Sequence, residues 1–227
     1  MKHFFGLLLL GIILITSVSA STLLTALPMG KGNWAFALSG AQSGNYNNVS
    51  NAKVNKYGLS IGYGLSNNFD MYCMYASSKS VDFSVLGGLV PADNATTSYG
   101  IVLAYNLLNE IKTKGPFSLT LALGGASFSS KTTAGGTDTI YNGSQGGGAL
   151  IISKLMIPFV PYAGITYMLQ NGDPGTKGVQ LDLAIGTVIA LSKQFATFIE
   201  YSSKGFTPDG GSSYSQGEVA MEFSYAP

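Results

Sequence analysis

The sequence predicts an all-β chain that closes into a transmembrane antiparallel up-and-down β-barrel of about ten strands, preceded by a cleaved signal peptide. The first observation is that apolar and small residues alternate strictly along about ten short runs. The second is that the connections between these runs are alternately long and short. The third is composition, since charged residues make up 10% of the chain, against about 25% in a typical soluble domain. Together they predict a barrel whose apolar face meets lipid.

Residues 1–20 are predicted to be a secretory signal peptide. They begin with Lys2 and His3, continue through an apolar run at 4–15, and end in small residues. The apolar run is too short to span a bilayer comfortably as a helix, so we expect cleavage rather than a retained anchor. The mature chain then has residues 21–32 as a periplasmic lead and 33–227 as the barrel domain.

The strongest strand signal is a predicted hairpin whose first strand alternates aromatic or aliphatic residues with glycine and serine. Asn67 and Asn68 tolerate the left-handed backbone of a tight turn, so the chain should fold back there as an antiparallel partner. The hairpin strands are predicted at 56–65 and 68–78, and the other strands at 33–40, 98–106, 116–129, 145–154, 159–170, 179–191, 195–202 and 216–225.

Long connections alternate with short ones along the predicted barrel. This rhythm places both termini and every short turn at one end and leaves the long loops to face outward from the cell. One long loop carries an apolar patch at 83–91, which fits either a strand extension with a turn at 87–88 or a flap or partner-binding tip at the barrel mouth. The long loops are predicted at 41–55, 79–96, 130–144, 171–177 and 203–215, and the short turns at 66–67, 109–115, 155–158 and 192–194.

Aromatic residues at the ends of the apolar face decide which solvent that face meets. A soluble lipocalin-like barrel would keep apolar residues inside and charges outside. Here the apolar face ends in aromatic residues, as the interface girdles of membrane proteins do. These residues are Trp34, Tyr57, Tyr63, Tyr99, Tyr105, Tyr201 and Tyr225.

The chain resembles the small outer-membrane β-barrel proteins of Gram-negative bacteria. The signal peptide, the hairpin YGLSIGYGLSNNFDMYCMYA and the last strand GEVAMEFSYAP carry the resemblance. It implies a location in the cell outer membrane, surrounded by outer-membrane lipid. In that family the final strand usually ends in an aromatic residue that the assembly machinery recognises, whereas here Ala226 and Pro227 follow Tyr225.

Composition excludes most catalytic chemistry. The chain's one histidine, His3, lies in the signal peptide, so Ser-His-Asp and Cys-His catalysis and histidine-ligated metals are excluded. Its one cysteine, Cys73, is predicted to be a small hydrophobe on the lipid face. Of the twelve basic residues one is Lys2, so the mature chain has eleven lysines, no arginine and eleven acids, which gives no reason to expect a nucleic-acid partner. We expect no enzyme, no cofactor and no metal site.

Acidic residues on the predicted inner face are the candidate functional residues. Asp182, Glu200 and Glu218 are expected near the outer mouth on three adjacent strands, and Glu222 deeper on the last strand. Lys56 is the one lumen-facing cation expected at that height. These acids are either solvated or bonded to tyrosine, serine and lysine in the lumen, or they focus a negative potential that favours cations.

Two functions remain open at this point. One is a surface-exposed barrel with a structural or adhesive role, whose long loops bind an extracellular ligand or a surface partner. The alternative is a narrow channel for ions or small solutes that weakly prefers cations. Small residues on the inner face leave volume for a cavity, but ten strands leave little room for a general porin. We expect a monomer.

Overall fold

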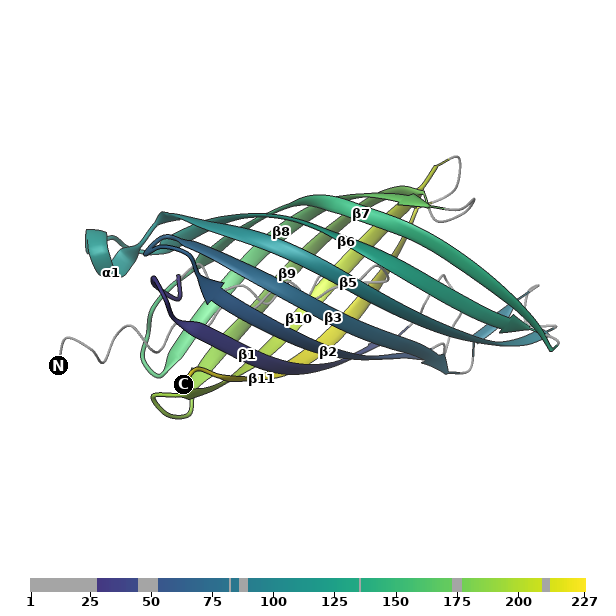
Figure 1. The fold of residues 1–227 in the computed structure, drawn as a ribbon, viewed down its shortest axis with the longest axis horizontal. Coiled ribbons are helices and arrows are strands. Elements are labelled where there is room, and N and C mark those ends of the chain that lie inside the picture. Colours follow the sequence, from purple (N-terminus) through teal and green to yellow (C-terminus); the bar gives the residue numbers. More distant parts are fainter. Residues whose placement is uncertain are drawn as a thin grey trace.

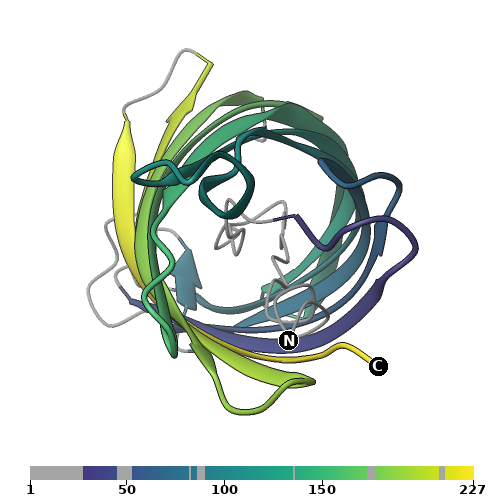
Figure 2. The same cartoon turned by 90° about the vertical axis from the view of Figure 1, so that its left-hand side faces the viewer.

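The computed structural model shows one sheet rolled into a closed barrel, viewed from the side in Figure 1 and along the barrel in Figure 2. It describes residues 28–44, 53–81, 83–85, 90–134, 136–172, 177–209 and 213–227. The predicted signal peptide and most of the predicted lead lie outside the described residues.

Ten antiparallel strands form the barrel wall, and the short β4 pairs with β5 alone. The ring closes where β1 pairs with β11 and where β3 pairs with β5, so the predicted fold and strand number are confirmed. The strands are β1 (Trp34–Gly44), β2 (Lys53–Gly64), β3 (Phe69–Val81), β4 (Phe83–Val85), β5 (Val90–Leu108), β6 (Ser118–Ala134), β7 (Thr137–Ser153), β8 (Phe159–Gly172), β9 (Gly178–Ala190), β10 (Phe195–Pro208) and β11 (Tyr214–Tyr225).

The two ends of the barrel differ. The end on the left of Figure 1, here the inner end, carries Pro28, the C-terminus and the connections at 65–68, 109–117, 154–158 and 191–194. The opposite outer end carries the long hairpins. Helix α1 (Glu110–Thr113) lies in the β5–β6 connection and projects over the inner mouth (Figure 2). No helix in the described part of the chain is long and apolar enough to cross a membrane.

Side chains alternate across the wall as the sequence predicts. Apolar residues such as Leu59, Leu183 and Phe223 are exposed on the outside, whereas their sequence neighbours are buried inside. Aromatic rings pair across strands in two bands on the outside. Near the inner end the centroids of Trp34 and Tyr63 are 4.6 Å apart, and towards the outer end Tyr75 and Tyr99 are 5.3 Å apart. A barrel with this outer face is matched to lipid.

Several predicted loops are strands instead. The segment 130–144 is the end of β6, a tight turn and the start of β7, and β10 continues to Pro208. Strand β1 likewise continues to Gly44, and β5 begins at Val90. Polar residues on both faces of these segments predict loops. Above the membrane, however, both faces of a sheet meet water, and hydrogen bonds between the backbones of neighbouring strands still hold the strands together.

The apolar segment at 83–91 is a strand extension. Phe83 and Val85 of β4 pair with Ala92 and Val90 of β5. The paired residues therefore form the strand extension, which is the first of the two alternatives, and not a flap over the mouth. The turn expected at 87–88 lies outside the described residues.

Candidate functional site

An ion cluster lies inside the outer half of the barrel. Glu218 of β11 accepts hydrogen bonds from the ammonium groups of Lys56 and Lys204, the second at 2.5 Å. All three side chains are buried. Lys56 comes from β2 and reaches Glu218 across β1, whose residues at this level, Ala41 and Ser43, are small. The cluster therefore joins strands on both sides of the β1–β11 closure.

Asp182 extends the cluster to β9. It is buried beside its cross-strand partner Lys204 and accepts a hydrogen bond of 2.7 Å from the side-chain amide of Gln180. Two lysines and two acids, Glu218 and Asp182, therefore balance formally. Buried charges are tolerable only when they are paired and hydrogen-bonded in this way.

Lys204 corrects the prediction that Lys56 is the one lumen-facing cation at this height. The sequence predicts a loop at 203–215, but β10 continues through Lys204. The signal was present in the sequence, because Glu200, Ser202 and Lys204 continue the inward alternation of the strand. With this second lysine, the four predicted lumen acids share the described lumen with two lysines, and the preference for cations stays a prediction.

Glu200 and Glu222 lie closer to the inner end than Glu218. Glu200 faces Ala220 across β10 and β11, one inward-facing position below Glu218, and accepts a hydrogen bond of 2.9 Å from the Tyr162 hydroxyl. The grouping of Glu200 with the outer acids therefore stays a prediction. Glu222 is fully buried another inward position further down.

Tyr162 reaches Glu200 because the strand between them has a glycine at that level. Tyr162 is on β8 and Glu200 on β10, and Gly186 of β9 is the cross-strand partner of both. A Cβ on Gly186 would lie 2.6 Å from the ring and hydroxyl of Tyr162. Gly62 likewise leaves space for the Tyr72 ring, since a Cβ on Gly62 would lie 2.8 Å from that ring.

The inner half of the lumen is filled by apolar side chains. Phe198 and Ile151 are fully buried there, and Tyr72 is nearly so. The small inward residues, which the sequence offered as evidence for a cavity, instead make room for large side chains on neighbouring strands. The packed cluster contains Met29, Ala35, Ala37, Tyr72, Met74, Val102, Ala104, Ala122, Ala149, Ile151, Val160, Tyr162, Val188, Ala196, Phe198 and Ala226.

The described part of the N-terminal lead enters this cluster. The backbone N–H of Met29 donates to buried Asp70 at 3.0 Å, and the Met29 side chain packs against Tyr72 and the inner face of Gly62. The Asn33 side-chain amide donates to the Met29 carbonyl at 2.7 Å. The lead is thus bonded into the inner mouth.

Other candidate chemistry is limited. Cys73 is a free, exposed cysteine on the outer face, where the sequence placed it. Within the described ranges no three histidine, cysteine or acidic side chains come close enough to hold a metal ion. The lumen arrangement pairs Glu218 with Lys56 and Lys204 and fills space, whereas Glu222 is fully buried and neither of its carboxylate oxygens accepts a hydrogen bond.

No protein-family model matches the sequence, and no curated protein sequence matches it. Solved structures are similar in fold. The translocator domain of the autotransporter NalP from Neisseria meningitidis is 12% identical, with 86% of this chain and 88% of that chain covered and a TM-score of 0.53. Neisserial surface protein A is 14% identical, with 85% and 95% covered and a TM-score of 0.42. Ail of Yersinia pestis is 14% identical, with 87% and 99% covered and a TM-score of 0.41.

At this identity a likeness shows the fold alone. The fold is that of an outer-membrane β-barrel, as the sequence resemblance implied. The apolar outer face with its two aromatic bands supports the same location, the outer membrane of a Gram-negative cell.

Proposed function

We propose that the protein is a structural or adhesive outer-membrane barrel, and that it binds surface partners through the β6–β7 hairpin at its outer end. The observation that carries the proposal is the length of this hairpin, which extends far beyond the neighbouring strand β8 (Figure 1). Strand β7 begins at Thr137, but its pairing with β8 begins only at Gly143.

The projecting part of β7 has an open edge. Residues 137–141 pair with β6, and none of the described residues pairs with their other side in the sheet. An open edge presents backbone N–H and C=O groups that can add an extended peptide as a further strand. Exposed side chains such as Ile140 lie along the same stretch. The hairpin therefore offers both backbone and side-chain contacts to a partner.

The projecting hairpin is held rigid by its own polar contacts. Asp138 forms an ion pair of 2.7 Å with Lys131 and accepts a hydrogen bond of 2.7 Å from the Thr133 hydroxyl. Hydrogen bonds from Lys131 and Thr133 hold the pKa of Asp138 below its usual range, so the carboxylate stays charged in mildly acid conditions. A pre-ordered strand loses less entropy on binding than a flexible loop.

Packing of side chains in the lumen supports this role over that of a channel. The inner half is packed with side chains such as Phe198 and Tyr72, and the outer half with paired ions. A water-filled pore would require polar walls with open space between them along the whole lumen.

The test combines adherence with conductance. Cells that express a variant with residues 132–139 replaced by an Asn-Gly turn should adhere less to immobilised extracellular-matrix proteins than cells with the intact hairpin. Heat-dependent gel mobility checks that the shortened barrel assembles, and Lys79→Gln on β3 serves as a control that keeps the hairpin and its polar contacts. In planar bilayers the intact protein should give no steady conductance. Unchanged adherence together with steady conductance would favour the channel.

A further inference from the structure

The inner end of the barrel carries a rim of exposed lysines. Every exposed charged side chain that the structure describes at this end is a lysine, and the terminal carboxylate of Pro227 is the remaining exposed anion. The two acids near this end, Asp70 and Glu110, are both buried. The lysines of this inner rim are Lys31, Lys112, Lys114, Lys154 and Lys193.

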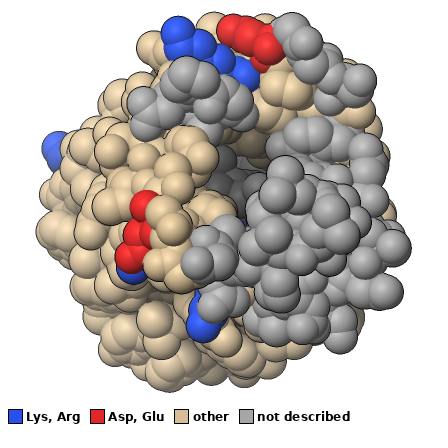
Figure 3. Space-filling model, turned by 90° about the vertical axis from the view of Figure 1, so that its right-hand side faces the viewer, with Lys and Arg blue, Asp and Glu red and all other residues tan. Residues whose placement is uncertain are grey.

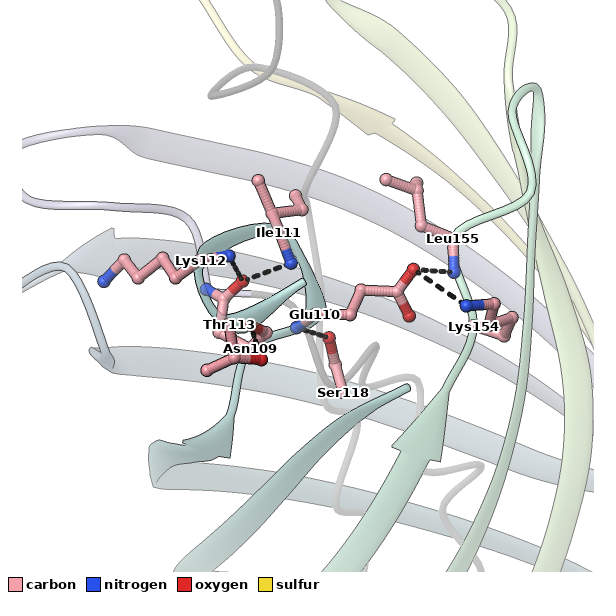
Figure 4. Close-up of polar contacts among 8 residues, drawn as sticks. All are labelled: Asn109, Glu110, Ile111, Lys112, Thr113, Ser118, Lys154 and Leu155. Carbon is pink, nitrogen blue, oxygen red and sulfur yellow. Dashed lines mark hydrogen bonds and ion pairs between the residues drawn. The ribbon is translucent and has the colours of Figure 1, made fainter. Parts of the chain in front are cut away.

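The buried acids are already occupied by the protein. Glu110 accepts a hydrogen bond of 3.1 Å from the backbone N–H of Leu155 and lies 3.6 Å from the Lys154 ammonium (Figure 4). Asp70 accepts from the Met29 backbone inside the lumen mouth. Five lysines against the two buried acids, Asp70 and Glu110, leave a formal charge of three at this end, and of two once the terminal carboxylate is counted.

Local structure fixes where two of the rim lysines lie. The Asn109 side chain caps α1 by accepting from the backbone N–H groups of Ile111 and Lys112. The Lys112 ammonium then donates to the Asn67 carbonyl at 3.2 Å and to the Asn68 side chain at 2.5 Å. The Lys31 backbone N–H donates to the Asn67 side chain at 3.4 Å. Lys112 is therefore held with its charge unneutralised beside the β2–β3 turn, and the Lys31 backbone is held at the same turn.

Two lysines of the inner rim are close in sequence to the inner aromatic band. Lys31 is three residues before Trp34, and Lys193 is two residues before Phe195. Trp34 and Tyr63 stack at this level, as do Phe195 and Tyr225. Aromatic bands mark the level of lipid headgroups, so lysines just beyond the band meet those headgroups.

The outer end has a different charge pattern. Lys131 is paired there with Asp138, and on the described part of this face acidic side chains adjoin basic ones in places (Figure 3). The asymmetry is therefore confined to one end of the barrel.

We infer that the inner rim binds anionic phospholipid headgroups and enriches these lipids in the leaflet around the inner end. Phosphate groups complement the ammonium groups, and the lipid-facing aromatic band continues into the rim. This inference goes beyond the proposed adhesive role and does not depend on it.

The chain's single tryptophan, Trp34, is a built-in probe for the test, because it is about half exposed on the outer face beside the rim. The folded protein is placed in vesicles of phosphatidylcholine with a fixed fraction of phosphatidylglycerol. In one series the phosphatidylglycerol carries brominated chains, and in the other an equal amount of phosphatidylcholine does. Bromine quenches tryptophan by contact, so quenching reports which lipid surrounds the rim.

Brominated phosphatidylglycerol should quench Trp34 more than brominated phosphatidylcholine does. The difference should correspond to a local excess of phosphatidylglycerol of about two- to fivefold, since a basic residue near an anionic surface contributes about 1 kcal/mol of binding free energy. High salt and the pair Lys31→Gln, Lys112→Gln should abolish the excess. The pair Lys79→Gln, Lys131→Gln at the outer end should leave it unchanged. Equal quenching by both brominated lipids, or an excess that survives loss of Lys31 and Lys112, would overturn the inference. Neither result bears on adherence or conductance.

Discussion

The two halves of the lumen are both packed, but by opposite means. The inner half uses apolar side chains such as Phe198, which lean over small residues on the next strand. The outer half uses buried ions, with Glu218 between Lys56 and Lys204. Burial of an apolar group is favourable by itself, whereas a buried ion is tolerable only while its partner is present. The halves should therefore respond differently to the loss of one side chain.

The largest expected effect is in the outer half. Glu218→Gln leaves two buried lysines with Asp182 as the one remaining carboxylate of the cluster, and should lower the free energy of unfolding by about 3–5 kcal/mol. Urea unfolding in lipid vesicles, followed by Trp34 fluorescence, measures it. The matched control removes all the charges of the cluster together, as Lys56→Met, Lys204→Met, Glu218→Leu and Asp182→Asn, and should cost much less. An equal loss in both variants would show that packing, not charge pairing, holds this half.

Phe198 tests the inner half in the same way. Phe198→Ala removes a fully buried ring and should lower the free energy of unfolding by about 3 kcal/mol, because a cavity remains among rigid strands. Phe223→Ala, on the lipid face, is the control and should cost less. If both alanine variants unfold at the same urea concentration, the inner half is not packed as described.

Gly186 tests whether the inner packing depends on close approach. Gly186→Ala places a methyl group against the Tyr162 ring and should cost about 1–3 kcal/mol through overpacking. Gly146→Ala is the matched control, because its Cβ would meet nothing closer than the Gly124 carbonyl at 3.6 Å. A neutral Gly186→Ala in the urea assay would contradict the crossing of Tyr162 over β9.

Tyr162 connects the two halves, and its hydroxyl should have the smallest effect. Tyr162→Phe keeps the ring but removes the hydrogen bond to Glu200, and should lower the free energy of unfolding by about 1 kcal/mol. Tyr167→Phe on the lipid face should change nothing measurable. A loss of several kcal/mol in Tyr162→Phe would mean that Glu200 belongs to the ionic half.

Much of the candidate site could be predicted from the sequence. Strand alternation places Asp182, Glu218, Glu222 and Lys56 on the inner face, and the structure has them there. Lys204 was missed because polar residues on both faces of a strand look like a loop. The hydrogen bond from Tyr162 to Glu200 was not predicted, because it depends on the register between strands, which alternation along one strand does not report.

The sequence by itself determined the faces of the wall, the ten strands and the apolar band. These follow from a period of two residues and from the small share of charge, which are properties of each segment alone. The tertiary structure decided how the lumen is filled. Lys56 meets Glu218 across β1, and Tyr162 meets Glu200 across Gly186, because register brings residues far apart in the chain to one level. Cross-strand proximity is a property of the closed sheet, so no single strand contains it.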